Sequence, residues 1–408
     1  MNTPKKADGL LRRTLSERVV IADGAMGTML QAANPSLADF QNHEGCNEIL
    51  NVSRPDIVRS VHDEYLAAGV DAIETNTFGA NWSNLADYGI EDRIYELAFA
   101  GGKIAREAAD AFSKPDKPRF VLGSLGPGTK LPSLGHTTYD NLKLAYYTAA
   151  KGLADSGCDA LLVETSQDLL QVKAAVNGCR EAINEAAHDI VLIAQVTVET
   201  TGTMLMGSEI GAALNALEPM GIDLIGLNCA TGPAEMSEHL RYLSKNANIG
   251  ISVMPNAGLP QLGPNGATYP LNPDELATAL DGFVTDYGIS LVGGCCGTTP
   301  AHLASVVAKL SKRKISQRTP ALDPGASSLY QYVPFRQDQT YLAIGERTNA
   351  NGSRAFRDAL LAEDWEKCVE IARDQIRDGA HMLDLSVDYV GRDGAADMSQ
   401  IASRFATA

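Results

Sequence analysis

The sequence of 408 residues lacks the features that would direct it to a membrane, to secretion or to nucleic acid. It has no run of about 18 apolar residues, so no segment is expected to span a membrane. Its basic N-terminus is not followed by an apolar core, so a secretory signal is not expected either. Acidic residues outnumber basic ones by 50 to 34, and the net charge is −16. This negative field repels phosphate backbones, so we expect no nucleic-acid partner.

Cysteine is also sparse, with seven residues scattered along the chain. An odd, scattered set in a chain of this length does not predict a disulfide framework and indicates a reducing, cytoplasmic setting. Two of the thiols, Cys295 and Cys296, are adjacent on the glycine-rich stretch "GGCCG". In a reducing compartment, clustered thiols indicate metal binding or catalysis. The cysteines without paired spacing are predicted to be packing residues: Cys46, Cys158, Cys179 and Cys368.

Short apolar runs rich in Val, Ile and Leu recur eight times in the first 300 residues. They lie at 19–27, 70–77, 120–127, 159–166, 190–198, 222–230, 249–258 and 289–297. Continuous apolar runs of this length are typical of strands that are buried on both faces of a parallel sheet. Amphipathic helical stretches lie between most of them, such as 54–69 and 141–157. One face of the first of these stretches carries Ile57, Val61, Tyr65 and Leu66.

Eight strands that alternate with helices predict an α/β protein that begins with a (β/α)₈ TIM barrel. An open doubly wound sheet is the structural alternative, because the number of strands alone does not exclude it. The barrel makes a sharper prediction, because its chemistry lies at the C-terminal ends of the strands. Polar or thiol residues follow nearly every apolar run and would converge on one mouth: Asp23, Glu74 to Thr77, Ser124, Glu164, Thr197, Cys229, Asn256, Cys295 and Cys296.

The composition changes from about residue 311 onwards. The segment 311–340 is polar, carries three prolines and lacks periodicity, which predicts a linker. We expect this linker to pack against other residues, because its aromatic side chains are costly to leave in water: Tyr330, Tyr332 and Phe335.

A strand at 341–349, a helix at 364–380 and a strand at 381–390 are predicted after the linker. So few elements do not complete a domain, so we expect the start of a second (β/α) barrel that is cut off. The expected domains are a barrel at 10–312, a linker at 313–340 and an incomplete domain at 341–408.

The thiols give the barrel a candidate metal site. Cys229 ends the sixth apolar run, and Cys295 with Cys296 ends the eighth, so in a barrel they share one rim with only one strand between them. Zinc binds cysteine sulfur at about 2.3 Å and prefers four tetrahedral ligands. Three protein ligands leave one position open, which is typical of catalytic sites. The alternative is that each cysteine is a small core residue.

The donor set also indicates the type of reaction. Zinc that is bound by three thiolates carries net negative charge, so it is a poor Lewis acid for the activation of water. It can still hold a fourth thiol as a thiolate at neutral pH. The chemistry that follows is alkyl transfer to the sulfur of a small thiol, rather than hydrolysis.

Several motifs resemble a known family. The stretches "DGAMGT", "ETNTFGAN", "GSLGP", "LLVET", "GLNCA", "MPNAG" and "GGCCGTTP" occur in this order. Together they resemble the homocysteine-binding barrel of the zinc-dependent homocysteine methyltransferases, over residues 10–312. The stretch "IGERTNANGSRAF" resembles the start of the methyltetrahydrofolate-binding (pterin-binding) barrel of the cobalamin-dependent methionine synthases.

The resemblance implies methyl transfer to the zinc-bound thiolate of L-homocysteine, which gives methionine. In the full-length enzyme, the implied donor is methylcobalamin that is recharged from 5-methyltetrahydrofolate. The implied zinc ligands are Cys229, Cys295 and Cys296, with the homocysteine sulfur as the fourth ligand. Asp23 and Glu164 are implied to hold the substrate's ammonium group, in agreement with the need of a buried amino group for carboxylate partners.

The resemblance implies four further contacts. Asn256 can offer a side-chain oxygen to zinc when substrate is absent, although it can equally be a turn-forming residue. Backbone N–H groups around Ser124 would bind the substrate carboxylate. In the second segment, Asn349 and Asp384 are candidate pterin contacts, although "LDLS" stands where the family commonly has "LDxN".

The chain has no Asp-x-His-x-x-Gly motif, which in cobalamin-binding modules supplies the histidine that binds cobalt. We therefore expect the cobalamin-binding module to be missing, and the chain alone to bind and activate homocysteine without completing the cycle. Two alternatives stay open. One is a cobalamin-independent homocysteine S-methyltransferase, and the other is an inactive truncated fragment that binds zinc and homocysteine.

Overall fold

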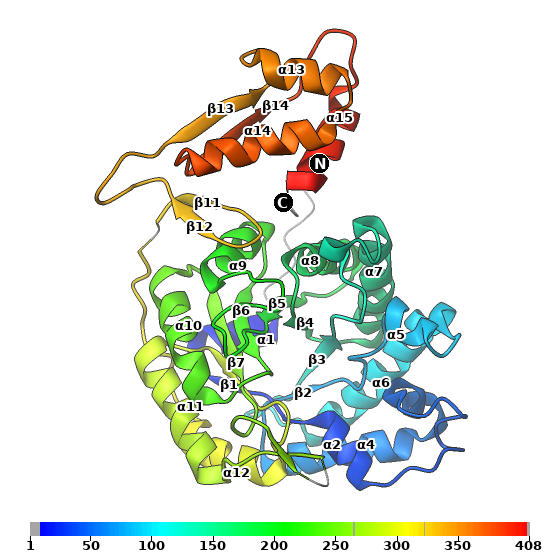
Figure 1. Ribbon diagram of the computed structural model, residues 1–408. Helices are drawn as coiled ribbons and strands as arrows, with labels where there is room; N and C mark the ends of the chain where they lie inside the picture. Colours follow the sequence, from blue (N-terminus) through cyan, green and yellow to red (C-terminus); the bar gives the residue numbers. More distant parts are fainter. Residues whose placement is uncertain (1–8, 264–265, 322, 406–408) are drawn as a thin grey trace. The chain divides into compact units, whose positions relative to one another are not determined.

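The computed structural model describes residues 9–263, 266–321 and 323–405 (Figure 1). These residues form two compact units, and the second unit begins at Asp323. Each unit is described by itself below. The domain limits expected from the sequence, at 10–312, 313–340 and 341–408, stay a prediction.

Eight parallel strands form the central sheet of the first unit (Figure 1). Their order around the sheet is β2-β3-β4-β5-β6-β7-β10-β1, which follows the chain. A doubly wound sheet would reverse its strand order, so this order excludes that alternative and confirms the TIM barrel. Each strand lies within one of the eight predicted apolar runs: β1 Val20–Ile21, β2 Ala72–Glu74, β3 Phe120–Leu125, β4 Ala160–Ser166, β5 Val191–Val196, β6 Leu224–Asn228, β7 Gly250–Met254 and β10 Leu291–Val292.

The seam between β1 and β2 closes the barrel without a regular ladder. Beside the N-terminal end of β2, Asp71 N donates to Ile21 O at 2.7 Å. At the C-terminal end of β2, Glu74 N donates to both carboxylate oxygens of Asp23, at 3.0 and 3.1 Å. A side chain at the mouth therefore supplies the contact that backbone pairing supplies elsewhere in the sheet.

One long helix follows each strand around the barrel: α4 Pro55–Ala68, α6 Ile94–Phe112, α7 Tyr139–Ser156, α8 Leu169–Glu185, α9 Ile210–Leu217, α10 Pro233–Asn246, α11 Pro273–Tyr287 and α12 Pro300–Leu310. The predicted helices at 54–69 and 141–157 are confirmed as α4 and α7. The four apolar residues expected on one face of α4 are all buried. Within the described residues, no helix is long and apolar enough to cross a membrane.

Shorter elements lie in the connections. The helices are α2 Met26–Ala32, α3 Leu50–Ser53 and α5 Trp82–Ala86, and the 3₁₀ turns are η1 Asn47–Ile49, η2 Glu91–Arg93, η3 Pro132–Leu134 and η4 Glu218–Met220. A two-stranded antiparallel hairpin follows β7 and consists of β8 Gln261–Gly263 and β9 Gly266–Thr268.

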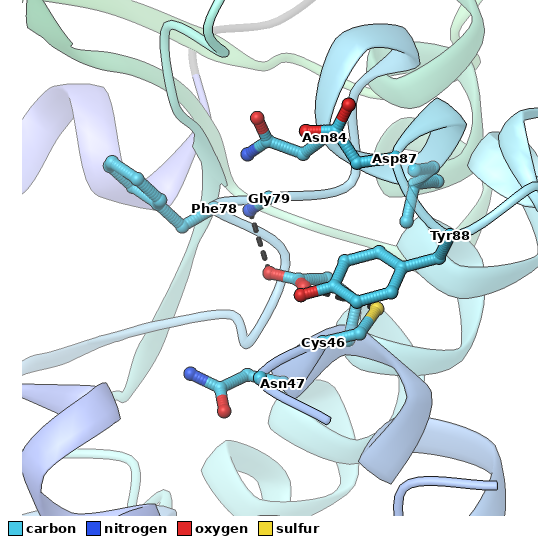
Figure 2. A pocket seen from close by; sticks show the side chains of 10 residues that line it. Cys46, Asn47, Phe78, Gly79, Asn84, Asp87 and Tyr88 are labelled. Atoms are coloured by element: carbon cyan, nitrogen blue, oxygen red, sulfur yellow. Dashed lines mark hydrogen bonds between the residues drawn. The ribbon is translucent and has the colours of Figure 1, made fainter. Parts of the chain in front are cut away.

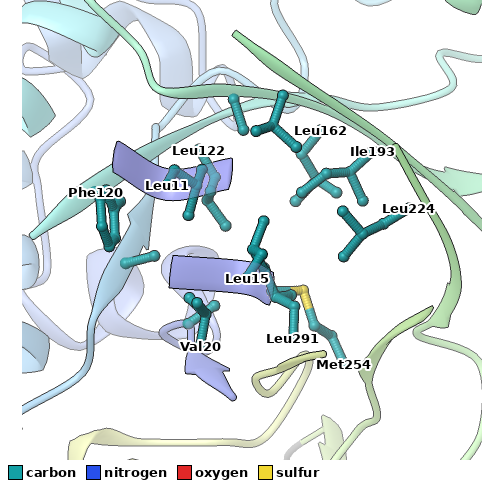
Figure 3. Close-up of a cluster of buried hydrophobic side chains, with 14 residues drawn as sticks. Leu11, Leu15, Val20, Phe120, Leu122, Leu162, Ile193, Leu224, Met254 and Leu291 are labelled. Atoms are coloured by element: carbon teal, nitrogen blue, oxygen red, sulfur yellow. The ribbon is translucent and has the colours of Figure 1, made fainter. Parts of the chain in front are cut away.

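Helix α1, Leu10–Glu17, closes the N-terminal end of the barrel. Its Leu11 and Leu15 belong to a cluster of buried apolar side chains inside the barrel (Figure 3). Most other members of the cluster are the first residues of strands: Val20, Ala72, Phe120, Ala160, Val191, Leu224 and Leu291. Arg12 fixes the helix from outside, because its guanidinium pairs with Asp189 at 3.1 Å and with Asp223. Apolar side chains fill the N-terminal end of the barrel, so a functional site is expected at the C-terminal ends of the strands.

Over its described residues, 323–405, the second unit contains two small sheets and three helices. The strands are β11 Gly325–Ser327 and β12 Tyr332–Pro334, which are antiparallel, and β13 Ile344–Asn349 and β14 Met382–Ser386, which are parallel. The helices are α13 Arg354–Leu361, α14 Trp365–Arg377 and α15 Gly394–Phe405. The predicted strand at 341–349, helix at 364–380 and strand at 381–390 are therefore confirmed. Phe356, Leu360 and Cys368 lie in the core of this unit.

The expectation that the aromatic side chains of 311–340 pack is wrong for two of the three. Tyr330 and Phe335 are 41% and 50% exposed. Tyr332 is half-buried, and its hydroxyl donates to Asp323 O within the same hairpin. Two strands of three residues each offer too little surface to cover such side chains. Arg318, in the part of the predicted linker that belongs to the first unit, donates to Ala247 O at 2.8 Å.

Candidate functional site

The three predicted zinc ligands converge at the C-terminal end of the barrel. Cys229 directly follows β6, and Cys295 and Cys296 lie on the turn after β10. Their sulfur atoms all lie within 4.8 Å of one another, and the Sγ atoms of Cys229 and Cys296 are 4.0 Å apart. Two sulfurs on one tetrahedral zinc ion lie about 3.8 Å apart when each bond is about 2.3 Å. The thiols are therefore spaced as zinc ligands are, which the packing interpretation does not require.

Glycines shape the turn that carries the two adjacent thiols. A Cβ atom at Gly294 would lie 2.4 Å from Thr298 Oγ1, so a side chain has no room there. Gly297 has a φ of 78°, and a Cβ atom on it would lie 2.3 Å from the ring of Tyr269. The turn is thus too tight for any residue with a side chain at these two positions, and it brings both thiols to the rim.

Asn256 holds the same turn from the loop after β7. Its Oδ1 accepts a hydrogen bond from Cys296 N at 3.0 Å. Cys296 O in turn accepts from Ala257 N at 3.0 Å. These contacts agree with the interpretation of Asn256 as a turn residue, whereas its contact with zinc stays a prediction.

Three residues other than glycine adopt left-handed backbone conformations at the C-terminal end of the barrel. The φ angles are 55° at Thr165, 59° at Cys229 and 55° at Ala230. Such residues cost about 1–3 kcal/mol each and cluster at functional sites. Thr165 also lies where the pairing of β4 with β5 shifts register, which is typical of a bulge beside a site.

The thiols influence one another's ionisation. Hydrogen bonds from the thiols of Cys229 and Cys295 lower the pKa of Cys296 to about 3, and the hydroxyl of Tyr269 contributes to this shift. Hydrogen bonds of the Cys295 thiol, first with Cys229 and then with Cys296, raise the pKa of Cys295 well above its usual range. The cluster thus favours a thiolate at Cys296.

Three acids face the mouth beside the thiols: Asp23, Glu74 and Glu164. Asp23 and Glu164 are buried, as expected for the predicted ammonium contacts. Burial raises the pKa of all three acids, and for Glu164 to about 7. Ser124 Oγ donates to Glu164 Oε1 at 2.5 Å, and Asn228 Nδ2 donates to Glu164 Oε2 at 3.1 Å. Glu74 was not singled out from the sequence, where it was one of several residues at a strand end.

The role expected for the backbone N–H groups around Ser124, contact with the substrate carboxylate, stays a prediction. Ser124 N donates to Thr75 Oγ1 at 3.0 Å, and Gly126 N donates to Phe78 O at 3.1 Å. Both of these N–H groups donate to acceptors within the protein. Ser124 positions Glu164 through its hydroxyl.

Asn228 is a second residue that the sequence analysis missed. Its Nδ2 donates to Glu164 Oε2 and, at 2.8 Å, to Thr165 Oγ1. Its Oδ1 accepts from Thr165 N at 2.7 Å. Asn228 thus joins the end of β4 to the end of β6, and only its place directly before Cys229 could have drawn attention to it.

The candidate pterin contacts lie in the second unit. Asn349 ends β13, and Asp384 lies in the neighbouring strand β14. Asn349 Nδ2 donates to Asp384 Oδ2 at 3.1 Å, so the structure brings the two side chains together.

A cavity of about 280 Å³ lies near the loop after β2 (Figure 2). Its lining includes Cys46, Glu48, Phe78 and Tyr88, but none of the clustered thiols or mouth acids. Glu48 Oε1 accepts from Gly79 N at 2.6 Å, and Cys46 Sγ lies 3.8 Å from Glu48 Oε2. These contacts use the buried carboxylate to join two loops, so we do not include the cavity in the candidate site.

Comparison with known proteins agrees with this geometry. The model of the homocysteine S-methyltransferase family matches residues 20–310, and the model of pterin binding enzymes matches residues 345–407. The methionine synthases of Mycobacterium tuberculosis and Mycobacterium leprae are 63% and 59% identical, over 393 and 402 residues. These matches cover 96% and 97% of this chain, but the chain spans 33%, or a third, of the length of these curated relatives.

Solved structures of the homocysteine methyltransferase MmuM from Escherichia coli are also similar. The metallated form has a TM-score of 0.60 and 24% identity, and the match covers 73% of this chain and 99% of that chain. The oxidised form has a TM-score of 0.56 and 23% identity, and the match covers 71% of this chain and 95% of that chain. At these identities, the similarity supports the barrel fold alone. Because the first family model extends over well more than half of the residues, the chain belongs to the homocysteine S-methyltransferase family.

Proposed function

We propose that this chain binds one zinc ion through Cys229, Cys295 and Cys296 and holds L-homocysteine there as the acceptor of a methyl group, which gives methionine. The observation that carries the proposal is the spacing of the three thiols, whose sulfur atoms lie within 4.8 Å of one another. Membership of the family and the similarity to two methionine synthases support the choice of substrate.

The three thiols fit the metal that the family implies. Zinc bound by them would favour the thiolate form of a fourth, substrate thiol and leave that sulfur nucleophilic. The turn around Cys295 and Cys296 is fixed by Asn256, so the chain holds its own sulfurs in place without help from a ligand.

Asp23 and Glu164 suit the other end of the substrate. Besides burial, the charge on Cys296 contributes to the raised pKa of Glu164, which indicates that acids and thiols are close. A small molecule whose ammonium-bearing carbon is joined to a thiol by two methylenes can therefore contact both groups. Ser124 and Asn228 orient Glu164 for this contact, because each donates a hydrogen bond to it.

For the full-length enzyme, we propose methylcobalamin, recharged from 5-methyltetrahydrofolate, as the donor. The names of the relatives and the match to pterin binding enzymes support this assignment. We propose Asn349 and Asp384 as pterin contacts, and binding and activation of homocysteine as the part performed by this chain. Turnover with S-methylmethionine and no cobalamin would contradict the proposed donor and favour a cobalamin-independent enzyme.

The test is the zinc content of the purified chain, together with X-ray absorption at the zinc edge. We expect about one zinc per chain with three sulfur ligands, rising to four on addition of homocysteine. Cys229→Ala and Cys296→Ala should each abolish stoichiometric zinc binding. Cys368→Ala, at a buried thiol of the second unit, is the matched control and should keep it. Absence of zinc from the wild-type chain, or no change in either variant at the mouth, would overturn the proposal.

A further inference from the structure

Glu74 differs from the other two mouth acids in how the protein holds its carboxyl group. The Glu164 carboxylate accepts hydrogen bonds from Ser124 and Asn228, which are neutral donors. The Asp23 carboxylate accepts from the backbone of Glu74. The Glu74 carboxyl, in contrast, is hydrogen-bonded to another carboxyl group, that of Glu164.

Despite this difference, the three acids have one property in common: within the described residues, each lacks a basic partner. Among residues 9–263, 266–321 and 323–405, no Lys, Arg or His forms an ion pair with Asp23, Glu74 or Glu164 or lowers their pKa. Two carboxyl groups that are hydrogen-bonded to each other need a proton between them. Acids grouped in this way out of water are stabilised when a cation replaces that proton.

The number of acids matches the number of donors on the proposed ligand. A primary ammonium group has three N–H donors and no acceptor. The contacts implied by the family supply two carboxylates, Asp23 and Glu164. Glu74 lies beside both, because its N–H binds Asp23 and its carboxyl binds Glu164. It is thus placed to accept from the third N–H.

We propose that Glu74 is a specificity-determining residue that binds the substrate's ammonium group as the third carboxylate and selects thiols that carry a primary amine. This inference rests on the proposed function, because it assumes that a thiol substrate is bound at Cys229, Cys295 and Cys296. The proton between Glu74 and Glu164 leaves to solvent when the ammonium group enters, so one positive charge replaces another and the net charge of the three acids with their cation is unchanged.

The test compares two ligands that differ only in the amino group. These are L-homocysteine and 4-mercaptobutanoate, which has the same thiol and carboxylate but no amine. Calorimetric titration of the zinc-loaded full chain measures both affinities. We expect the wild-type chain to bind homocysteine at least about tenfold more tightly than the analogue, because hydrogen bonds to charged groups are strong.

Glu74→Gln should lower the affinity for homocysteine by about tenfold or more and change that for 4-mercaptobutanoate by less than about twofold. Glu107→Gln, the same change at an exposed position on α6, is the matched control and should alter neither affinity. Glu74→Asp keeps the charge and should retain part of the preference for the amine. Zinc content and thermal unfolding are measured for every variant.

The outcomes separate this inference from the proposed function. If the wild-type chain binds neither thiol, the proposed function fails regardless of Glu74. If it binds homocysteine and Glu74→Gln keeps the wild-type preference, the inference is overturned while the proposed function stands. Equal loss of both affinities, or loss of zinc from both Glu74 variants, would show a structural role and would also overturn the inference.

Discussion

The two ends of the barrel are built on opposite principles. The N-terminal end is filled with apolar side chains, including Leu11 and Leu15 of α1 (Figure 3). The C-terminal end contains acids that face one another, clustered thiols and non-glycine residues with positive φ. Burial at the first end stabilises the fold, whereas burial at the second raises the pKa of Glu164 and disfavours its charge.

This difference shows how the barrel separates stability from chemistry. The residues with positive φ and the buried acids at the mouth are unfavourable by themselves. They persist because the rest of the barrel, including its packed N-terminal end, holds them in place. Substitutions at the two ends should therefore have opposite consequences. Three measurements, taken in order of expected effect, test this contrast.

The largest effect is expected at the packed end. Leu11 is 2% exposed, and Leu11→Ala should lower the free energy of unfolding by about 2–5 kcal/mol because it leaves a cavity. Zinc content should not change, because the thiols lie at the other end. Leu10→Ala, on the exposed side of the same helix, is the control and should have little effect. Urea unfolding measures the stability, and loss of zinc from Leu11→Ala would break the contrast.

At the mouth, a substitution should stabilise the chain and weaken its function. The folded-state pKa of Glu164 is about 7, against 4.5 unfolded, because the carboxylate is buried. The folded state therefore holds this proton more tightly, and its stabilising contribution is complete below pH 4.5 and is lost as the pH rises through 7. Glu164→Gln should raise the free energy of unfolding at pH 8 by about 1–3 kcal/mol.

The measurement is urea unfolding of the metal-free wild type and Glu164→Gln at pH 5 and at pH 8. The advantage of the variant should be present at pH 8 and much smaller at pH 5. Its affinity for homocysteine should fall, because an ammonium contact is lost. Equal advantage at both pH values would show that Glu164 is not the cause.

The smallest effect on stability is expected at a buried histidine in the layer of helices around the barrel. His62 on α4 is fully buried, and neither ring nitrogen has a hydrogen-bond partner. Burial, with a smaller effect of Arg59, lowers the pKa of His62 to about 3 from 6.5. The unfolded chain therefore binds a proton that the folded chain excludes, so stability falls as the pH drops from 6.5 towards 3.

His62→Leu should thus raise the free energy of unfolding by about 1 kcal/mol more at pH 5.5 than at pH 8. This pH dependence is opposite in sign to that of Glu164, so the two groups can be separated in one series of urea titrations. An advantage that does not grow on acidification would contradict the assignment.

The sequence predicted the features that depend on local pattern. The eight strands were found because each is a continuous apolar run, and the thiols were found because each ends such a run. Their convergence at 4.8 Å or less followed from the geometry of a closed barrel. The rejection of an open sheet needed the strand order, which counting does not provide.

Features that depend on distant partners were not predicted. The role of α1 depends on Asp189 and Asp223, which pair with Arg12 from far along the chain. Asn228 donates to Glu164, which is 64 positions away in the sequence, and Ser124 N donates to Thr75 Oγ1, which is 49 positions away. Nothing in the residue types indicates these partners, because an asparagine or serine at a strand end can form many different hydrogen bonds.

Asp23 carries a consequence of its own, since it joins the seam of the barrel and also lines the proposed substrate site. The charge of its carboxylate sets the strength of the hydrogen bond that links β1 to β2 at the mouth. A ligand that changes this charge also changes how firmly the ring of strands is closed. A ligand bound at Asp23 in the proposed site would therefore act on the same carboxylate that joins β1 and β2, the first and last strands in the order around the sheet.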